Sequence, residues 1–228
     1  MNYYFLFFFF MIIIIFILCE LDRTYEITYT KYSYYIECFP NQIYYGVHNS
    51  IYRIFNKRYI FDTNKFNFHH FLMKNVKNLQ NEFITHNKNI QIHAHKTNTT
   101  ILDYDESYSY IRFLFFNKLH SQNIKKFKTI KKFLKLFPEI KCCFLSIMKK
   151  KKYIKTHRGP YSGLLRYHLP VFISNPYLCY IEVMGKKLYY DKSFIFDDTY
   201  PHLLMKKDDS LRVVLICDVI NPYSFSFF

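Results

Sequence analysis

The sequence predicts a mainly β protein: an antiparallel sandwich or barrel, such as a jelly roll, with flanking helices and a hydrophobic helix at its N-terminus. Six runs rich in β-branched and aromatic residues follow one another from residue 142 onward, at 142–148, 164–173, 179–183, 187–190, 193–197 and 211–219. Gly-Pro, Asn-Pro and Met-Gly pairs punctuate these runs as turn signals. Successive short strands with few helices are typical of a sandwich or barrel.

The chain begins with 17 almost uninterrupted apolar residues, Tyr3 to Cys19. This length is short for a membrane-spanning helix, which needs about 20 residues, and long for the core of a signal peptide. No charged n-region precedes the segment and no A-x-A-like cleavage site follows it. We expect an uncleaved signal anchor over residues 1–22; a cleaved signal peptide and a buried segment are the alternatives.

Residues 23–105 form a poorly defined region that is rich in aromatic residues, Asn and Lys. Only Phe71 to Phe83 indicates a helix there. The pairs His69-His70 and His93-x-His95 lack a Cys or carboxylate at ligand spacing, so we interpret them as ordinary histidines. Asn98 starts an N-glycosylation pattern, which would matter only in a lumenal segment.

The segment before the strand runs combines a strand with a helix. Tyr108 to Phe116 is apolar and aromatic, which predicts a strand. Asn123 to Phe137 predicts one amphipathic helix, with lysines on one face and apolar residues on the other. We expect the apolar face to pack on the neighbouring sheet; lying on a membrane is the alternative. Pro138 ends the helix.

Charge and cysteine content exclude few classes of function. The formal net charge is +15, which suits nucleic acid or a phospholipid surface, although lysines spread over the whole surface are the preferred explanation. No zinc-finger spacing, RNP signature or glycine-rich loop accompanies the charge, so no nucleic-acid partner is expected. The six cysteines show neither CxxC spacing nor a regular framework, and we expect no disulfide scaffold.

Two histidines lie where a rigid sheet could bring them to one metal ion. His157 precedes a Gly-Pro turn, and His202 follows the apolar run 194–196 and an acidic turn. We expect both in loops at strand ends. Neutral imidazole suits Fe(II), and an oxygenase site needs open positions for co-substrate and O2.

Arginines in apolar strands need anionic partners, either a ligand or a carboxylate of the chain. Arg166 and His168 are two residues apart in a predicted strand, so their side chains share a face. Arg212 opens a very apolar run. A buried guanidinium is costly without an anion, and a dicarboxylate ligand would satisfy both arginines. Pairing with Asp197, Asp198 or Asp218 is the alternative.

Five blocks of this region, in register, resemble the aspartyl/asparaginyl β-hydroxylase family, over about 130–222. They are Ser146-Ile147-Met148, His157-x-Gly159-Pro160, Leu165-Arg166-x-His168-Leu169, Phe196-Asp197-Asp198-Thr199-x-x-His202 and Arg212-Val213-x-Leu215-x-x-Asp218-Val219-x-x-Pro222. The resemblance implies a double-stranded β-helix (jelly-roll, cupin-like) core over 106–228 and an Fe(II)- and 2-oxoglutarate-dependent dioxygenase.

The resemblance also implies roles for individual residues. His157 and His202 would be the iron ligands, and Gly159 stands where most relatives among such oxygenases have a carboxylate. Ser146 and Arg212 would hold the distal carboxylate of 2-oxoglutarate. Arg166 and His168 would seat its metal-binding end. Asp197 and Asp198 would orient His202 rather than bind iron.

The expected activity is oxidative decarboxylation of 2-oxoglutarate with O2, coupled to hydroxylation of a substrate C–H bond. We expect Asp or Asn side chains of secretory-pathway proteins as substrates, with a single-pass anchor in the endoplasmic reticulum membrane. A lipid acyl chain and a non-catalytic, membrane-tethered binding protein are the alternatives. The lysine-rich segment Lys149 to Lys155 replaces the family's usual loop before His157, which suggests either acidic or phosphate-bearing substrates or a solvated lysine run.

Overall fold

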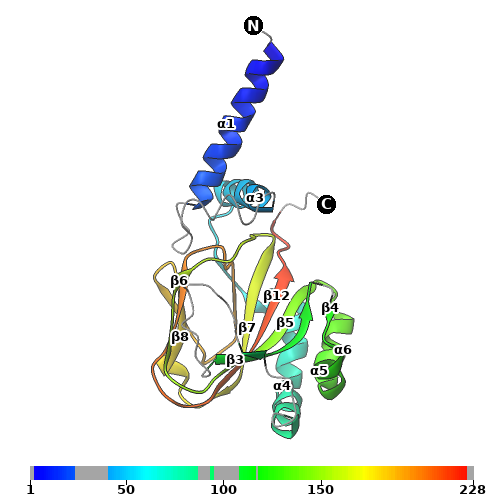
Figure 1. The fold of residues 1–228 in the computed structure, drawn as a ribbon. Coiled ribbons are helices and arrows are strands. Elements are labelled where there is room, and N and C mark those ends of the chain that lie inside the picture. Colours follow the sequence, from blue (N-terminus) through cyan, green and yellow to red (C-terminus); the bar gives the residue numbers. More distant parts are fainter. Residues whose placement is uncertain (1–2, 24–40, 87–92, 95–107, 117, 225–228) are drawn as a thin grey trace.

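Two antiparallel sheets face each other in the computed structural model, and helices cover the outside of the larger one (Figure 1). The structure describes residues 3–23, 41–86, 93–94, 108–116 and 118–224. The Asn98 pattern, His95 and Cys38 lie outside these residues.

The larger sheet has the strand order β1-β10-β7-β12-β5-β3-β2, with β4 paired to β3. Its central strands are long: β5 (Ile140–Met148), β7 (Leu164–Ile173) and β12 (Arg212–Ile220), with β3 (Tyr108–Phe115) beside them. Shorter strands complete it: β1 (Ile60–Phe61), β2 (His93–Ala94), β4 (Lys118–Leu119) and β10 (Phe194–Phe196).

The smaller sheet has the order β6-β11-β8-β9. Its strands are β6 (Lys152–His157), β8 (Cys179–Val183), β9 (Lys186–Tyr189) and β11 (His202–Lys206). The structure thus confirms a mainly β, jelly-roll-like architecture and the six predicted strands. Strands β6 and β11 were not expected from composition. Their lysines and alternating burial hide them from a search for apolar runs.

Two apolar layers separate the elements. Met148, Phe196, Val214 and Ile216 belong to the layer between the sheets. On the other face of the larger sheet, Leu145, Val213 and Leu215 pack with residues of helix α4 (Asn67–His86) and helix α6 (Lys128–Leu136). Burial on both faces explains why β5, β7 and β12 read as continuous apolar runs.

The amphipathic segment 123–137 forms two short helices instead of the one helix that we expected. Helix α5 (Ser121–Lys126) and α6 are separated at Phe127, whose φ of −110° and ψ of 83° are not helical. Phe127, Ile130 and Phe133 are fully buried in the core under the larger sheet. Packing on the sheet is therefore confirmed, and the burial of Phe127 accompanies the break.

Helix α1 (Tyr3–Arg23) projects away from the sheets and contacts helix α3 (Asn41–Phe55), which lies across one end of the jelly roll (Figure 1). The described side chains of α1 are largely exposed, among them Phe7, Phe8 and Phe10. Within the described part of the chain, no helix combines the length and the hydropathy of a membrane span.

Most of the lysine-rich segment 149–155 belongs to strand β6 instead of the loop that we expected before His157. Lys152 opens β6 and pairs with Lys206, whereas His157 ends the strand. At about 3.3 Å per residue, Lys152 and His157 are about 17 Å apart. Lys149, Lys150 and Lys151 are exposed at the far end of the strand from His157, so the structure favours the solvated lysine run.

Candidate active site

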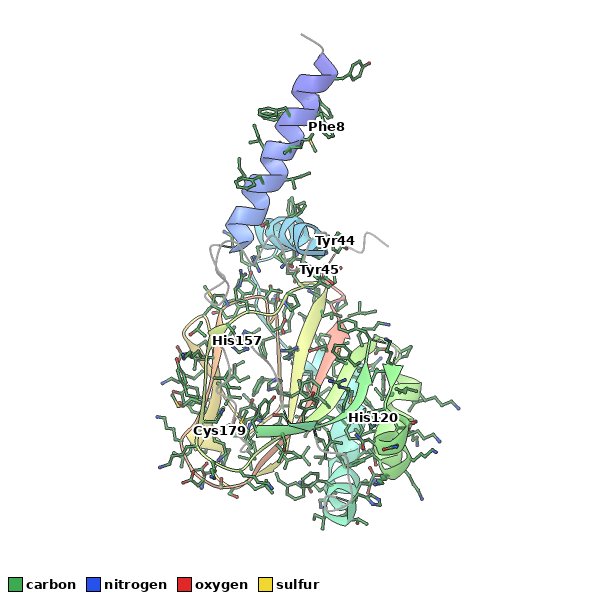
Figure 2. The ribbon with its side chains drawn as sticks, viewed as in Figure 1. Phe8, Tyr44, Tyr45, His120, His157 and Cys179 are labelled. Carbon is green, nitrogen blue, oxygen red and sulfur yellow. The ribbon has the colours of Figure 1, made fainter. Side chains whose placement is uncertain are left out.

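The two histidines meet at one end of the smaller sheet. His157 and His202 are direct partners in the pairing of β6 with β11, and their ring centroids are 4.2 Å apart. His202 is 4% exposed and its ring lies against Phe196 of the facing sheet. Figure 2 shows His157 toward the end of the jelly roll that α3 covers, with Cys179 near the opposite end. Both histidines are terminal strand residues rather than loop residues.

Hydrogen bonds fix the same tautomer in both rings. Nδ1 of His157 lies 2.8 Å from the carbonyl oxygen of Lys155, and Nδ1 of His202 lies 2.9 Å from that of Tyr200. A carbonyl oxygen only accepts, so each Nδ1 carries the proton and each Nε2 keeps its lone pair. That lone pair is what a metal ion binds, and a carbonyl on the other nitrogen is the usual support of a ligating imidazole.

Burial keeps both imidazoles neutral. It lowers the pKa of His157, and the pKa of His202 lies well below its ordinary value because of burial and the neighbouring His157. Protons therefore compete little with a metal at neutral pH. Among the residues that the structure describes, no group of three or more His, Cys, Asp or Glu could hold a metal ion.

The space beside Gly159 is filled by a carboxylate from another loop. A Cβ added to Gly159 would lie 2.2 Å from Cγ of Asp198. The Gly159 amide also donates to the carbonyl oxygen of Asp198 at 2.7 Å. Asp198 thus occupies the room that a side chain at position 159 would need.

A buried guanidinium lies between the sheets on the larger one. Arg212 is 1% exposed and donates to Ser146 Oγ at 3.0 Å and to the Tyr190 hydroxyl at 2.5 Å. Among the described residues no carboxylate forms an ion pair with Arg212, and its Nε is buried without a hydrogen-bond partner. A buried cation without an anion is unfavourable, and a guanidinium fork matches a carboxylate. Arg212 therefore fits a carboxylate ligand, and Ser146 lies beside it as predicted.

His168 offers a second unsatisfied group in the same layer. Its Nδ1 lies 2.9 Å from the Tyr190 hydroxyl, which already accepts from Arg212. The tyrosine proton is not used in that bond, and its donation to Nδ1 places the imidazole proton on Nε2. That Nε2 is buried and has no partner among the described residues. Burial and Arg212 place the pKa of His168 well below its ordinary value, so the ring is a neutral donor.

Arg166 has carboxylate partners of its own. Its Nε and Nη2 donate to Asp218 at 2.8 and 3.0 Å, and its Nη1 lies 2.9 Å from Asp198. The alternative pairing is thus confirmed for Arg166, but not for Arg212. Burial raises the pKa of Asp198, and the Arg166 guanidinium opposes that rise. A direct contact of Arg166 with a co-substrate stays a prediction. In the structure Arg166 stabilises the loop before His202 through its ion pair with Asp198.

Asp197 shapes the same loop. Its Oδ1 accepts from the Thr199 amide at 2.9 Å and from the Thr199 hydroxyl at 2.7 Å. Burial raises the pKa of Asp197 to about 6, against these two hydrogen bonds. These contacts order the turn into β11, in agreement with the orienting role expected for Asp197.

Sequence reasoning missed Tyr190, which joins Arg212 to His168. The chain has 23 tyrosines, and no spacing distinguishes this one. Tyr190 follows β9 of the smaller sheet, and only the packing of the two sheets brings its hydroxyl to both residues of the larger one.

Comparison with known proteins gives the following similarities. The model of the aspartyl/asparaginyl beta-hydroxylase family matches residues 73–222, which extends further upstream than the motifs indicated. An ornithine lipid ester-linked acyl 2-hydroxylase of Rhizobium tropici is 34% identical over 104 residues, which cover 44% of this chain. The chain spans 37% of the length of that relative.

Two solved structures illustrate the structural similarity. A prolyl-4-hydroxylase of Pseudomonas putida has a TM-score of 0.41 and 10% identity, over 64% of this chain and 85% of its own. A 2OG-Fe(II) oxygenase family oxidoreductase of Burkholderia pseudomallei has a TM-score of 0.41 and 12% identity, over 65% and 78%. Because the family model covers well over half of the residues, the chain belongs to the aspartyl/asparaginyl β-hydroxylase family.

Proposed function

We propose that this protein is an Fe(II)- and 2-oxoglutarate-dependent hydroxylase. The observation that carries the proposal is the pair His157 and His202, whose rings lie 4.2 Å apart with both Nδ1 atoms bound to carbonyl oxygens. Family membership agrees with it. In this proposal the Nε2 atoms of both histidines hold the iron.

The residues around Arg212 fit 2-oxoglutarate. Arg212 and Ser146 would hold one carboxylate of the keto-diacid, and the partnerless Nε2 of His168 would donate to another oxygen. The bound iron, with 2-oxoglutarate and O2, would supply the oxidant that hydroxylates a C–H bond, with succinate and CO2 as co-products. The chain itself contributes position, neutral imidazoles and an apolar surrounding from Phe194 and Phe196 that excludes water.

For the substrate we favour a lipid acyl chain. The curated relative carries that activity in its name, and the chain is 34% identical to it over 104 residues. Exposed Phe and Ile side chains of α1 lie beyond α3, on the side of the jelly roll where His157 lies (Figure 2). An acyl chain at a lipid surface could contact the apolar side chains of α1 and reach the end of the jelly roll where His157 lies. Single-pass topology and the endoplasmic reticulum stay predictions.

Asp or Asn side chains of proteins are the second candidate, and the description of the matched family supports them. The two substrate classes separate in one assay. Purified full-length protein with Fe(II) and 2-oxoglutarate is given either ornithine-containing lipid in mixed micelles or a peptide with Asp and Asn. Mass spectrometry then looks for the gain of one oxygen atom.

The proposal expects succinate that depends on iron and on 2-oxoglutarate, and oxygen incorporation into the lipid. The matched control is His202→Ala, which removes one imidazole. If oxygen is incorporated into the peptide but not into the lipid, the substrate is an Asp or Asn side chain of a protein and not a lipid acyl chain. Succinate production that is absent at every iron concentration would refute the proposal and favour the non-catalytic binding protein. Equal succinate production in the His202→Ala variant would refute His202 as an iron ligand.

A further inference from the structure

Helix α3 contacts both of the loops that adjoin the histidines, the loop after His157 and the loop before His202. Residues 41–55 precede the part of the chain that the family model matches, so the family resemblance does not account for this helix. It crosses the end of the jelly roll at which His157 lies (Figure 2). Its buried face has polar residues: His48 and Asn49 are each 1% exposed.

Asn49 holds the loop that follows His157. Its Nδ2 donates to the carbonyl oxygen of Pro160 at 2.9 Å, and its Oδ1 accepts from the Ser162 amide at 2.8 Å. One amide side chain therefore satisfies a donor and an acceptor of the same loop, as a neighbouring strand would. His48 adds a contact of 3.0 Å from Nδ1 to the Ser162 hydroxyl.

The last turn of α3 holds the loop that precedes His202. Arg53 donates to the carbonyl oxygen of Thr199 at 3.1 Å and its guanidinium lies 5.5 Å from the ring centroid of Tyr200. The Tyr200 hydroxyl donates to the carbonyl oxygen of Asn56, just beyond the helix, at 3.2 Å. The carbonyl oxygen of this same Tyr200 orients the His202 ring.

We propose that α3 fixes the distance and orientation of His157 relative to His202, with Asn49 and Arg53 as positioning residues. The inference rests on the proposed function, because it takes the two histidines as metal ligands. Two protein ligands constrain the geometry of a metal site less than three do. The contacts that hold the loops next to the two histidines therefore contribute more to that geometry. Loss of a group that hydrogen-bonds directly to a metal ligand typically weakens metal binding by about 10–100-fold. Asn49 and Arg53 act one contact further out, through the loops, so we expect the lower end of this range.

The test measures the dissociation constant for Co(II), an O2-stable substitute for Fe(II), on the full chain. Asn49→Ala removes both loop contacts. Asn123→Ala is the matched control: Asn123 is also 1% exposed, and its Nδ2 also donates to a backbone carbonyl, that of Arg112, at 2.9 Å. Thermal unfolding of both variants measures the general loss of stability.

We expect Asn49→Ala to raise the Co(II) dissociation constant about tenfold and to alter the visible absorption of bound Co(II). Asn123→Ala should lower the unfolding temperature similarly and leave the dissociation constant within about twofold of wild type. A wild-type constant in Asn49→Ala, or equal weakening in Asn123→Ala, overturns the inference.

Arg53→Met keeps the test decisive if Asn49→Ala does not fold, because Arg53 is only half-buried. It should also weaken Co(II) binding about tenfold, and an unchanged constant would refute the role of α3. His157→Ala separates this inference from the proposed function. If His157→Ala binds Co(II) as wild type does, the ligand assignment fails; if it loses Co(II) while the α3 variants keep it, only the inference fails.

Discussion

Replacing Gly159 by Ala tests whether the Asp198 carboxylate and position 159 compete for one space. The added Cβ would lie 2.2 Å from Cγ and 2.3 Å from Oδ2 of Asp198, far closer than nonbonded atoms approach. The carboxylate must move, and movement separates it from Arg166, whose Nη1 lies 2.9 Å away. Gly159 and Asp198 should therefore be energetically coupled.

The size of the effect follows from this ion pair. Breaking a buried pair costs about 3–5 kcal/mol. We expect the lower end, about 3 kcal/mol, because Arg166 keeps Asp218 and its side chain is 27% exposed. For a chain of this size, that corresponds to a drop of about 6–12 °C in the unfolding temperature. Urea denaturation at neutral pH measures the free energy directly.

A double-mutant cycle isolates the coupling. In an Asp198→Ala background the close atoms are gone, so Gly159→Ala should cost less than about 1 kcal/mol there. Gly185→Ala is the control, because Gly185 has no atom within 4 Å of an added Cβ and a φ of +79°. Its strain of about 1–2 kcal/mol should be the same with and without Asp198. If Gly159→Ala costs equally in both backgrounds, the competition for space does not exist.

Three further outcomes are expected. Arg212→Met should leave the unfolding temperature of the ligand-free protein nearly unchanged, because it removes a buried cation that lacks a carboxylate. The variant should no longer show a rise in unfolding temperature when 2-oxoglutarate is added, and a retained rise would refute the carboxylate site. Tyr190→Phe should lower the unfolding free energy by about 1–3 kcal/mol in urea denaturation, because Arg212 and His168 each lose a buried hydrogen-bond partner. An unchanged free energy would mean that water replaces the hydroxyl. The pKa of Asp197 is raised to about 6 from 3.8, so its ionisation weakens the folded state as pH rises from about 4 to about 6, by up to about 3 kcal/mol. Burial raises the pKa of Asp198 as well, so Asp197→Asn should reduce the decline by about this amount rather than remove it. In urea denaturation across the window, a decline of the same size in the variant and the wild type would refute the assignment.

The residues that sequence alone could locate are those in long runs or in spaced motifs. Strands β5, β7 and β12 are apolar on both faces because helices cover the outer face and the smaller sheet covers the inner one. Such runs stand out in the sequence. His157 and His202 were recognisable from the motifs around them, not from their separation in the chain.

Strand pairing decided where the candidate site residues lie. The lysines of β6 hide a strand, and only its register with β11 brings His157 opposite His202. The same pairing places Lys152 at the other end, away from the histidines. A lysine run has no apolar period, so composition could not show which end faces the site.

Partner choice for the arginines also required the tertiary structure. Arg166 and Arg212 pose the same problem in sequence, a cation in an apolar strand. Folding gives Arg166 two carboxylates and gives Arg212 two hydroxyls, from Ser146 and Tyr190. The sequence by itself determined the family and singled out the two histidines as candidate ligands, because both depend on residue types at fixed spacing. The tertiary structure alone decided which buried cation lacks an anion and that α3 spans both histidine loops, because these depend on contacts between segments far apart in the chain.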